Sequence, residues 1–203
     1  MDITYKIEFH NDWHCGSGLS AGADVDLLVI KDKQKLPFVP GKTMKGLVKE
    51  AMIDILTFKK NNQKDTIIEK LLGKANEKHA DIKEEIESTK EEAESIKQGC
   101  LFFTNAELDE ATANLILEEE TTEFLYRDIA STAINDKGVA MKHSLRKLQV
   151  TIPCTLFGII KNTPAENVEL IEQSLKYIKR LGQNRNRGLG RCDITIIEKG
   201  GLS

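Results

Sequence analysis

The sequence predicts an α+β fold with a ferredoxin-like (RRM-like) core, and three observations lead to this expectation. Apolar and polar residues alternate over 3–9, which is the period of a half-buried strand. Two amphipathic helices are expected, one beginning near residue 41 and the other near residue 164. Each is followed by further strand-like runs, so each helix returns the chain to a sheet. The length of 203 residues fits a single domain, 1–203, that carries insertions.

The N-terminal elements follow from local patterns. A Gly-, Ser- and Asp-rich stretch over 11–26 indicates a loop with tight backbone turns. The apolar run 27–30 predicts a second strand, and 36–40 is expected to be extended, because residues that precede proline avoid the helical region. A helix then begins near Gly41, with Gly41 or Thr43 as its expected cap. Its apolar face comprises Met44, Leu47, Val48, Ala51, Ile55 and Leu56.

A charged insertion is expected over 74–99, after a short helix that ends at Gly73. Lys and Glu dominate this segment, and its few apolar residues form only a thin stripe. One interpretation is an exposed helical arm, stabilised by ion pairs four residues apart. The alternative is a charged and partly disordered loop.

The C-terminal half combines strand-like runs with one more helix. Strands are expected over 100–104, 148–152, 155–160 and 192–198. Residues 106–117 show no clear pattern, and the segment Asn135-Asp-Lys-Gly138 is typical of a hairpin turn. The second amphipathic helix is expected from about Pro164 to Leu181, because proline suits the first turn of a helix.

Charge is distributed unevenly along the chain. The net charge is −3, but residues 31–60 carry a local +5 and residues 137–191 a local +8, whereas 105–128 carry −7. Such a chain can present one face to a polyanion and keep a separate acidic face. Aromatic residues make up only 5% of the chain, which argues against a large stacking platform.

Several classes of protein are disfavoured. No run approaches the ~18 apolar residues needed to cross a bilayer, and the N-terminus lacks the apolar region of a secretory signal. We therefore expect a cytoplasmic protein with no membrane partner. The four cysteines lie far apart and are expected to be free thiols. The segment His10–Cys15 contains metal-ligand residue types but has no second half to complete four ligands, so structural or RNA-contacting roles are expected.

The strongest candidate site is the glycine-rich basic segment 182–191. Glycines let the backbone approach a ligand closely, and arginines supply bidentate donors suited to phosphate. The segment follows a helix and precedes a strand, which is not the context of a dinucleotide fold, and it contains no Walker A motif. A solvated basic turn is the alternative. The candidate residues are Arg185, Arg187, Gly188, Gly190 and Arg191.

Two other basic segments are candidates for anion contacts. Lysines at a helix N-terminus oppose the helix dipole unless an anion neutralises them. A basic stretch after the predicted hairpin turn is suited to gripping a polyanion. In both cases the alternative is that the side chains simply reach solvent. The residues are Lys42, Thr43 and Lys45 at the helix start, and Lys142, His143 and Arg146 after the turn.

Acidic residues gather in the loop that follows the first strand. Asp24 and Asp26 are two residues apart, and Asp32 lies beyond them. Loop carboxylates can hold a divalent ion or orient a nucleophile. In isolation, loop aspartates more often form turns.

Taken together and in this order, these segments resemble the RAMP superfamily of CRISPR-associated proteins. The stretches similar to the opening signature are Gly16-Ser-Gly18, Asp26-Leu-Leu-Val-Ile-Lys-Asp32 and Pro37-Phe-Val-Pro-Gly-Lys-Thr-Met-Lys-Gly46. The middle strand of the family is similar to Leu71-Leu-Gly73 with Leu101-Phe-Phe-Thr-Asn-Ala-Glu-Leu108. The approach to the inserted thumb hairpin is similar to Thr132-Ala-Ile-Asn-Asp-Lys-Gly-Val-Ala140 with Ser144-Leu145. The glycine-rich loop is similar to Asn184-Arg-Asn-Arg-Gly-Leu-Gly-Arg191. The likeness covers most of the chain except roughly residues 74–99.

Within that superfamily, the Asp26–Asp32 arrangement is most similar to the repeated backbone subunit of type III effector complexes. The resemblance implies a subunit that lines a guide RNA and cuts the bound target RNA, with Asp26, or else Asp24, as the catalytic residue. It implies guide contacts from the glycine-rich loop and the Lys42–Lys45 helix start, and target contacts from a thumb over about 121–149. A divalent cation, Mg²⁺, is expected to act transiently at Asp26.

The partners implied by the resemblance are guide RNA, target RNA, other effector subunits and copies of the chain itself. A non-catalytic RAMP scaffold that binds or caps the guide RNA is the first alternative. A stand-alone protein that binds phosphate or a nucleotide is the second.

Overall fold

The core of the molecule is a four-stranded antiparallel sheet. The computed structural model describes residues 1–18, 25–74 and 98–200. The strands are β1 (Asp2–Phe9), β2 (Phe102–Phe103), β5 (Thr155–Lys161) and β6 (Cys192–Gly200). They lie in the order β2-β5-β1-β6, with β1 paired to both β5 and β6. With one helix after β1 and another after β5, this is the ferredoxin-like topology that the sequence predicts.

Three helices cover one face of the sheet. The helices are α1 (Gly41–Phe58), α2 (Lys64–Leu72) and α4 (Val168–Tyr177). The odd-numbered residues of β1 are buried against them, whereas Thr4, Lys6 and Glu8 on the other face are half-buried or exposed. The alternation in the sequence therefore identified both the strand and its buried face. The largest fully buried side chains include Ile3, Tyr5, Ile7, Met44, Met52, Leu156, Ile160, Ile171 and Leu175.

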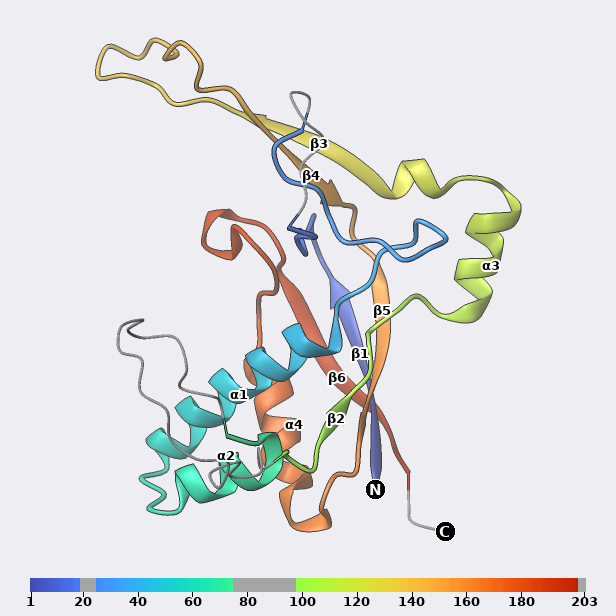
Figure 1. Ribbon diagram of the computed structural model, residues 1–203, viewed down its shortest axis with the longest axis vertical. Coiled ribbons are helices and arrows are strands. Elements are labelled where there is room, and N and C mark those ends of the chain that lie inside the picture. The colour runs from blue at the N-terminus through green and yellow to red at the C-terminus, as the bar shows by residue number, and fades with distance from the viewer. Residues whose placement is uncertain (19–24, 75–97, 201–203) are drawn as a thin grey trace, which may run out of the picture.

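A two-stranded ribbon extends away from this core (Figure 1). It consists of β3 (Tyr126–Ser131) and β4 (Arg146–Thr151), which pair with Ile129 opposite Leu148. At its tip, the Gly138 N–H donates to the Asn135 carbonyl at 2.9 Å, which confirms the predicted turn. We call residues 126–151 the thumb. The break predicted between two strands near Pro153 is confirmed, and it separates β4 and β5 into different sheets.

Several predicted elements were wrong in extent. Residues 27–30 form no strand; they make only isolated bridges, such as Leu27 with Leu148 and Val29 with Gly16. This segment lies beside the thumb and not within the main sheet. The N-cap of α1 is Pro40, which makes no side-chain capping bond, and the Gly41 N–H donates instead to the Asn105 side chain at 3.1 Å, so the expectation for Gly41 or Thr43 was wrong.

The region after the charged insertion also departs from expectation. The strand predicted over 100–104 is only two residues long as β2. The predicted second helix is shorter, because α4 is preceded by the 3₁₀ turn η2 (Ala165–Asn167) and ends at Tyr177. The helix α3 (Glu110–Glu118) was not predicted, and none of its residues is buried, so it lacks the apolar face that identified α1. It begins with Asp109, whose carboxylate accepts a hydrogen bond from the Thr112 N–H.

Two further predictions from the sequence concern the charged insertion and the cysteines. The charged insertion expected over 74–99 lies almost entirely outside the described residues, apart from its two ends, where Gly73 bridges to Gln98. All four cysteines are described and are free, as expected. Across the described ranges, no helix has the length and apolar character to cross a membrane.

Candidate nucleic-acid interface

The glycine-rich segment 182–191 folds into a loop whose backbone requires its glycines. Gly182, Gly188 and Gly190 all have positive φ, and Asn184 joins them at φ 54°. A Cβ on Gly190 would lie 1.9 Å from the Leu181 carbonyl oxygen, and one on Gly182 would lie 2.3 Å from that of His14. These two glycines are needed for close packing, whereas a Cβ on Gly188 would meet nothing within 4 Å.

The arginines of this loop differ in what they contact. The Arg185 guanidinium lies 3.8 Å from the Glu50 carboxylate of α1, and the Arg185 carbonyl accepts a hydrogen bond from Arg180 at 2.6 Å. The exposed side chains of Arg187 and Arg191 make no hydrogen bond or ion pair with any described residue. Two guanidinium groups are therefore presented to solvent from a fixed backbone, which is the arrangement suited to phosphate contacts.

The start of α1 lies beside a pocket of about 500 Å³. Lys42 and Lys45 line it, together with the segment 98–103 and Asn162. No acidic residue occupies the first turn of the helix, so the two lysines add to the positive end of the dipole. Thr43 differs from them, because its hydroxyl interacts with the buried Cys15 thiol.

Asp26 is attached to the thumb at Lys147 of β4. Its N–H donates to the Lys147 carbonyl at 3.0 Å, and its Oδ2 accepts from the Lys147 N–H at 2.8 Å. The residue is exposed. Asp24, the alternative catalytic candidate, lies outside the described residues. Asp32 forms a turn, since its carboxylate accepts from the N–H groups of Gln34 and Leu36, both at 2.8 Å.

The tip of the thumb is both basic and apolar. Lys142, His143 and Arg146 are exposed, as the sequence suggested, and His143 has the left-handed φ of 58°. More than half of the surface of four apolar side chains is also exposed. They are Ile134, Val139, Met141 and Leu145. The charged residues were found from the sequence, whereas the apolar ones were not singled out, because apolar residues of these types are more often buried.

The structure brings the candidate segments together in two groups. Asp26 is joined to the thumb at Lys147, and the glycine-rich loop reaches α1 through Arg185 and Glu50. The segment His10–His14, for which the sequence predicted structural or RNA-contacting roles, lies between these two groups and contacts both. His14 is fully buried, and this burial lowers its pKa, so it is a neutral structural residue and not an exposed ligand.

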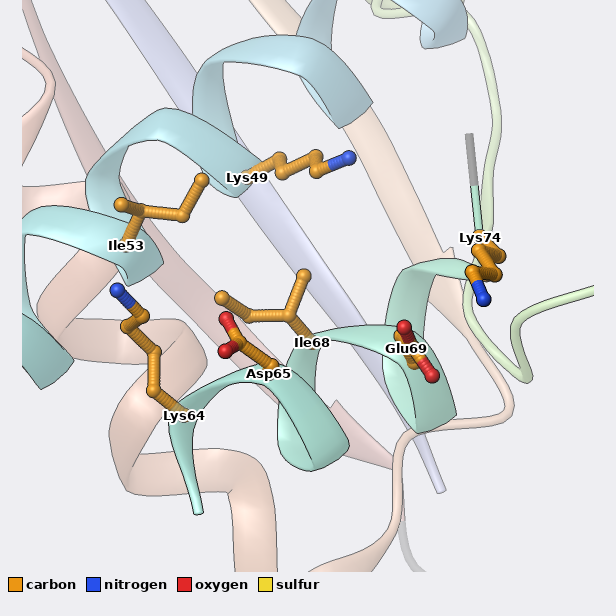
Figure 2. Close-up of a pocket in the computed structure, with 8 residues that line it drawn as sticks. Lys49, Ile53, Lys64, Asp65, Ile68, Glu69 and Lys74 are labelled. Atoms are coloured by element: carbon orange, nitrogen blue, oxygen red, sulfur yellow. The ribbon is translucent and has the colours of Figure 1, made fainter. Parts of the chain in front are cut away.

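A smaller hollow of about 260 Å³ lies between α1 and α2 (Figure 2). Figure 2 shows Lys49 and Ile53 of α1 facing Lys64, Asp65 and Ile68 of α2. Acidic and basic groups alternate along its rim, so it offers no consistent charge to an anion, in contrast to the glycine-rich loop.

The described residues offer little chemistry for other kinds of site. They contain no group of three or more His, Cys, Asp or Glu side chains that could hold a metal ion. Burial raises the pKa of Cys154 to about 11 and that of Cys192 to about 12, so both thiols are protonated at neutral pH and are poor nucleophiles. The strongest interface in the described ranges is therefore the basic surface around the glycine-rich loop and thumb.

Comparison with protein families identifies the class to which this fold and this surface belong. The model of the RAMP superfamily matches residues 6–193, and the chain belongs to that superfamily. A comparison with curated proteins finds no match.

Two solved structures share the fold over nearly the whole chain. One is a chain of the type III-B Cmr-beta complex in its apo state, with a TM-score of 0.70 and 13% identity, where 98% of each chain is covered. The other is a chain of the type III-B Cmr-beta complex bound to cognate target RNA, with a TM-score of 0.64 and 11% identity, where 97% of each chain is covered. This likeness spans the thumb as well as the core.

Proposed function

We propose that this chain is a guide-RNA-binding backbone subunit of a type III CRISPR effector complex that cleaves complementary target RNA. Membership of the RAMP superfamily and the similarity to chains of type III-B complexes, one of them bound to target RNA, support this proposal. The observation that carries it is the position of Asp26, an exposed residue whose carboxylate and backbone N–H each make one hydrogen bond to the backbone of Lys147 in a basic thumb.

The proposed division of roles follows the geometry of the two basic regions. The glycine-rich loop and the Lys42–Lys45 helix start would contact the phosphates of the guide, because their backbone is fixed by the core. The thumb would contact the target through Lys142, His143 and Arg146. Such contacts read phosphate and shape, as expected of a subunit that accepts any guide sequence.

The proposed cleavage uses a nucleophile that RNA itself supplies. The 2′-OH of the nucleotide before the cut attacks the adjacent phosphorus, and Asp26 accepts its proton as a general base. The bond between the 2′-oxygen and phosphorus forms while the bond from phosphorus to the 5′-oxygen breaks, and the leaving oxygen takes a proton from water. The products are a 2′,3′-cyclic phosphate and a 5′-hydroxyl.

The described residues do not by themselves form a complete site for the divalent cation expected at Asp26. A single carboxylate is a weak site for Mg²⁺, which usually takes several oxygen ligands, and no further acidic or imidazole group forms a cluster there among the described residues. Phosphate oxygens of the RNA would have to supply the missing ligands. The proposed role of Asp26 as a base assigns no step to the cation.

The decisive experiment is target cleavage by the assembled complex that contains Asp26→Asn. We expect cleavage to fall by at least about 10²-fold, which is the usual contribution of a general base, while guide binding and assembly are retained. Asp32→Asn is the matched control, since this carboxylate only forms a turn. Asp24→Asn tests the alternative aspartate. Unchanged cleavage in both the Asp26 and Asp24 variants would refute the catalytic role.

One observation favours the second candidate, a non-catalytic scaffold that binds or caps the guide. The hydrogen bond from the Lys147 N–H to the Asp26 carboxylate is a sufficient structural reason for this aspartate. A scaffold should bind guide RNA without cutting the target and be present once per complex, and replacement of either aspartate should leave target cleavage by the complex unchanged. Native mass spectrometry of the purified complex gives the copy number and separates the two candidates.

A further inference from the structure

The segment His10–His14 is bonded to the glycine-rich loop along one side. The Asn11 side chain donates to the Gly188 carbonyl and accepts from the Arg191 N–H, the latter at 2.8 Å. The Asp12 carbonyl accepts from the Gly190 N–H at 2.8 Å. Further along, the His14 carbonyl accepts from the Gln183 N–H at 2.8 Å. Four hydrogen bonds with Asn11, Asp12 and His14 thus set the path of the loop.

Asp12, Trp13 and His14 of the same segment are bonded to the foot of the thumb, which we define as residues 126–127 and 149–151, where the thumb joins the core. Arg127 of β3 donates from Nε to the Asp12 carboxylate at 2.7 Å and also from a terminal nitrogen. Trp13 exchanges two backbone hydrogen bonds with Thr151, at 2.8 and 3.0 Å. The His14 Nδ1–H donates to the Gln149 carbonyl at 2.6 Å.

The connecting segment is packed into the core at Trp13 and Asp12. Trp13 is 1% exposed and stacks on Phe9 of β1, with ring centroids 4.4 Å apart and an interplanar angle of 7°. The Asp12 side chain is 8% exposed, whereas that of Arg127 is 64% exposed. A buried carboxylate is costly without a charged partner. Asp12 therefore bonds to both regions: its carboxylate pairs with Arg127 of β3, and its backbone carbonyl accepts from the Gly190 N–H of the loop.

We infer that Asp12 and Arg127 are positioning residues that couple the glycine-rich loop to the thumb, so that occupation of the loop by RNA orders the foot of the thumb and with it Asp26. The inference rests on the proposed function, because it assumes that the loop binds RNA. Asp26 shares in the coupling, since it is bonded to Lys147 of β4. By linkage, a partner that fixes the thumb should raise the affinity of the loop by the same factor.

Hydrogen exchange with and without poly(U) RNA tests the coupling in the full chain. The background carries Lys142→Ala, His143→Ala and Arg146→Ala, so the thumb tip loses the three side chains proposed to contact RNA. In this background we expect RNA to slow exchange in the glycine-rich loop and, by at least about fivefold, in β3 and β4. Adding Asp12→Asn should abolish the slowing in β3 and β4 while that in the loop persists.

Two more substitutions keep the test informative. Arg127→Gln replaces an exposed partner of the same pair, so it should fold even if Asp12→Asn does not, and it should have the same effect; Arg127→Lys should restore part of the coupling. Asp193→Asn is the matched control. Asp193 pairs with His10 and Lys179 at 2.9 and 2.8 Å, beside the same loop, and has no contact with the thumb among the described residues.

The outcomes separate the inference from the proposed function. No slowing in the loop of the wild-type chain would remove the proposed RNA site and the coupling with it. Slowing in the loop without slowing in β3 and β4 of the triple variant would overturn the coupling alone. Equal slowing in β3 and β4 with Arg127→Gln and with Asp193→Asn would also overturn it.

Discussion

The glycine-rich loop and the thumb tip are both basic and both proposed to contact RNA, yet they are held in opposite ways. The loop is bonded to the segment His10–His14 on one side, and on the other the Leu181 N–H donates to the Gly190 carbonyl at 2.9 Å. The bonds of the thumb tip are internal among the described residues: Asn135 accepts from the N–H groups of Lys137 and Val139, each at 3.0 Å.

This difference indicates what each region can do. A loop whose form is imposed by the core presents its arginines at fixed positions, which suits a ligand of constant shape such as a phosphate backbone. Beyond Lys147, the ribbon makes no hydrogen bond with other described segments, and its tip exposes apolar and basic side chains, so it can adjust to its partner. The same charge therefore serves a rigid surface in one place and an adaptable one in the other.

Alanine at Gly190 and at Gly138 is the strongest way to test the comparison. Gly190→Ala places a Cβ 1.9 Å from the Leu181 carbonyl oxygen at a φ of 70°, so we expect a loss of about 2–4 kcal/mol of unfolding free energy together with RNA binding. Gly138→Ala in the thumb has a similar φ of 76° but meets nothing within 4 Å, so it should cost about 1 kcal/mol. Urea denaturation measures both values. Equal losses would show that the loop is no more constrained than the thumb.

Removal of the exposed charges is expected to have a smaller, purely electrostatic effect. Arg187→Ala with Arg191→Ala should weaken binding of single-stranded RNA about tenfold at low salt and lower the slope of log affinity against log salt by about 1.4, since each phosphate contact contributes about 0.7. Lys142→Ala with Arg146→Ala, the matched pair in the thumb, should change binding of a bare guide less. Fluorescence anisotropy at several salt concentrations provides the slopes. A larger effect from the thumb pair would reverse the proposed roles.

The free energy of unfolding should depend on pH through His14, which lies in the segment His10–His14 between the loop and the thumb. Burial lowers its folded pKa below the unfolded value, so the unfolded chain takes up the proton first as the pH falls. Its contribution to stability is therefore complete above an unfolded pKa of about 6.5 and is lost as the pH falls from there to the folded value. His14→Asn keeps a donor for the Gln149 carbonyl but cannot be protonated. Urea midpoints at pH 7 and pH 5 should fall more for the wild type than for this variant; parallel falls would contradict the assignment.

The exposed apolar residues of the thumb tip should matter least to the fold. Ile134→Ser and Met141→Ser replace side chains that are 65% and 54% exposed, so the free energy of unfolding should stay within about 0.5 kcal/mol of the wild-type value. Thermal denaturation is the measurement. A clear destabilisation would show that the tip packs against the rest of the chain and is not the adaptable end of the comparison.

The sequence alone determined the elements that have a local signature. The alternation over 3–9 identified β1 and its buried face, the apolar spacing after residue 43 identified α1, and Asn135–Gly138 identified the turn of the thumb. The positions of the basic candidates were also readable, because glycine and arginine are concentrated within one short segment. Each of these features depends on residues a few positions apart, where backbone geometry restricts the possibilities.

The tertiary structure alone decided how these elements combine. Asp12 and Arg127 are separated by 115 positions, and nothing local to either residue indicates the other. The run 27–30 looks like a strand, yet it lies beside the thumb with isolated bridges, because strand formation needs a partner of matching length. Helix α3 was missed because none of its residues is buried. Local periodicity records which side of an element is buried, but only the packed chain determines which distant residues meet there.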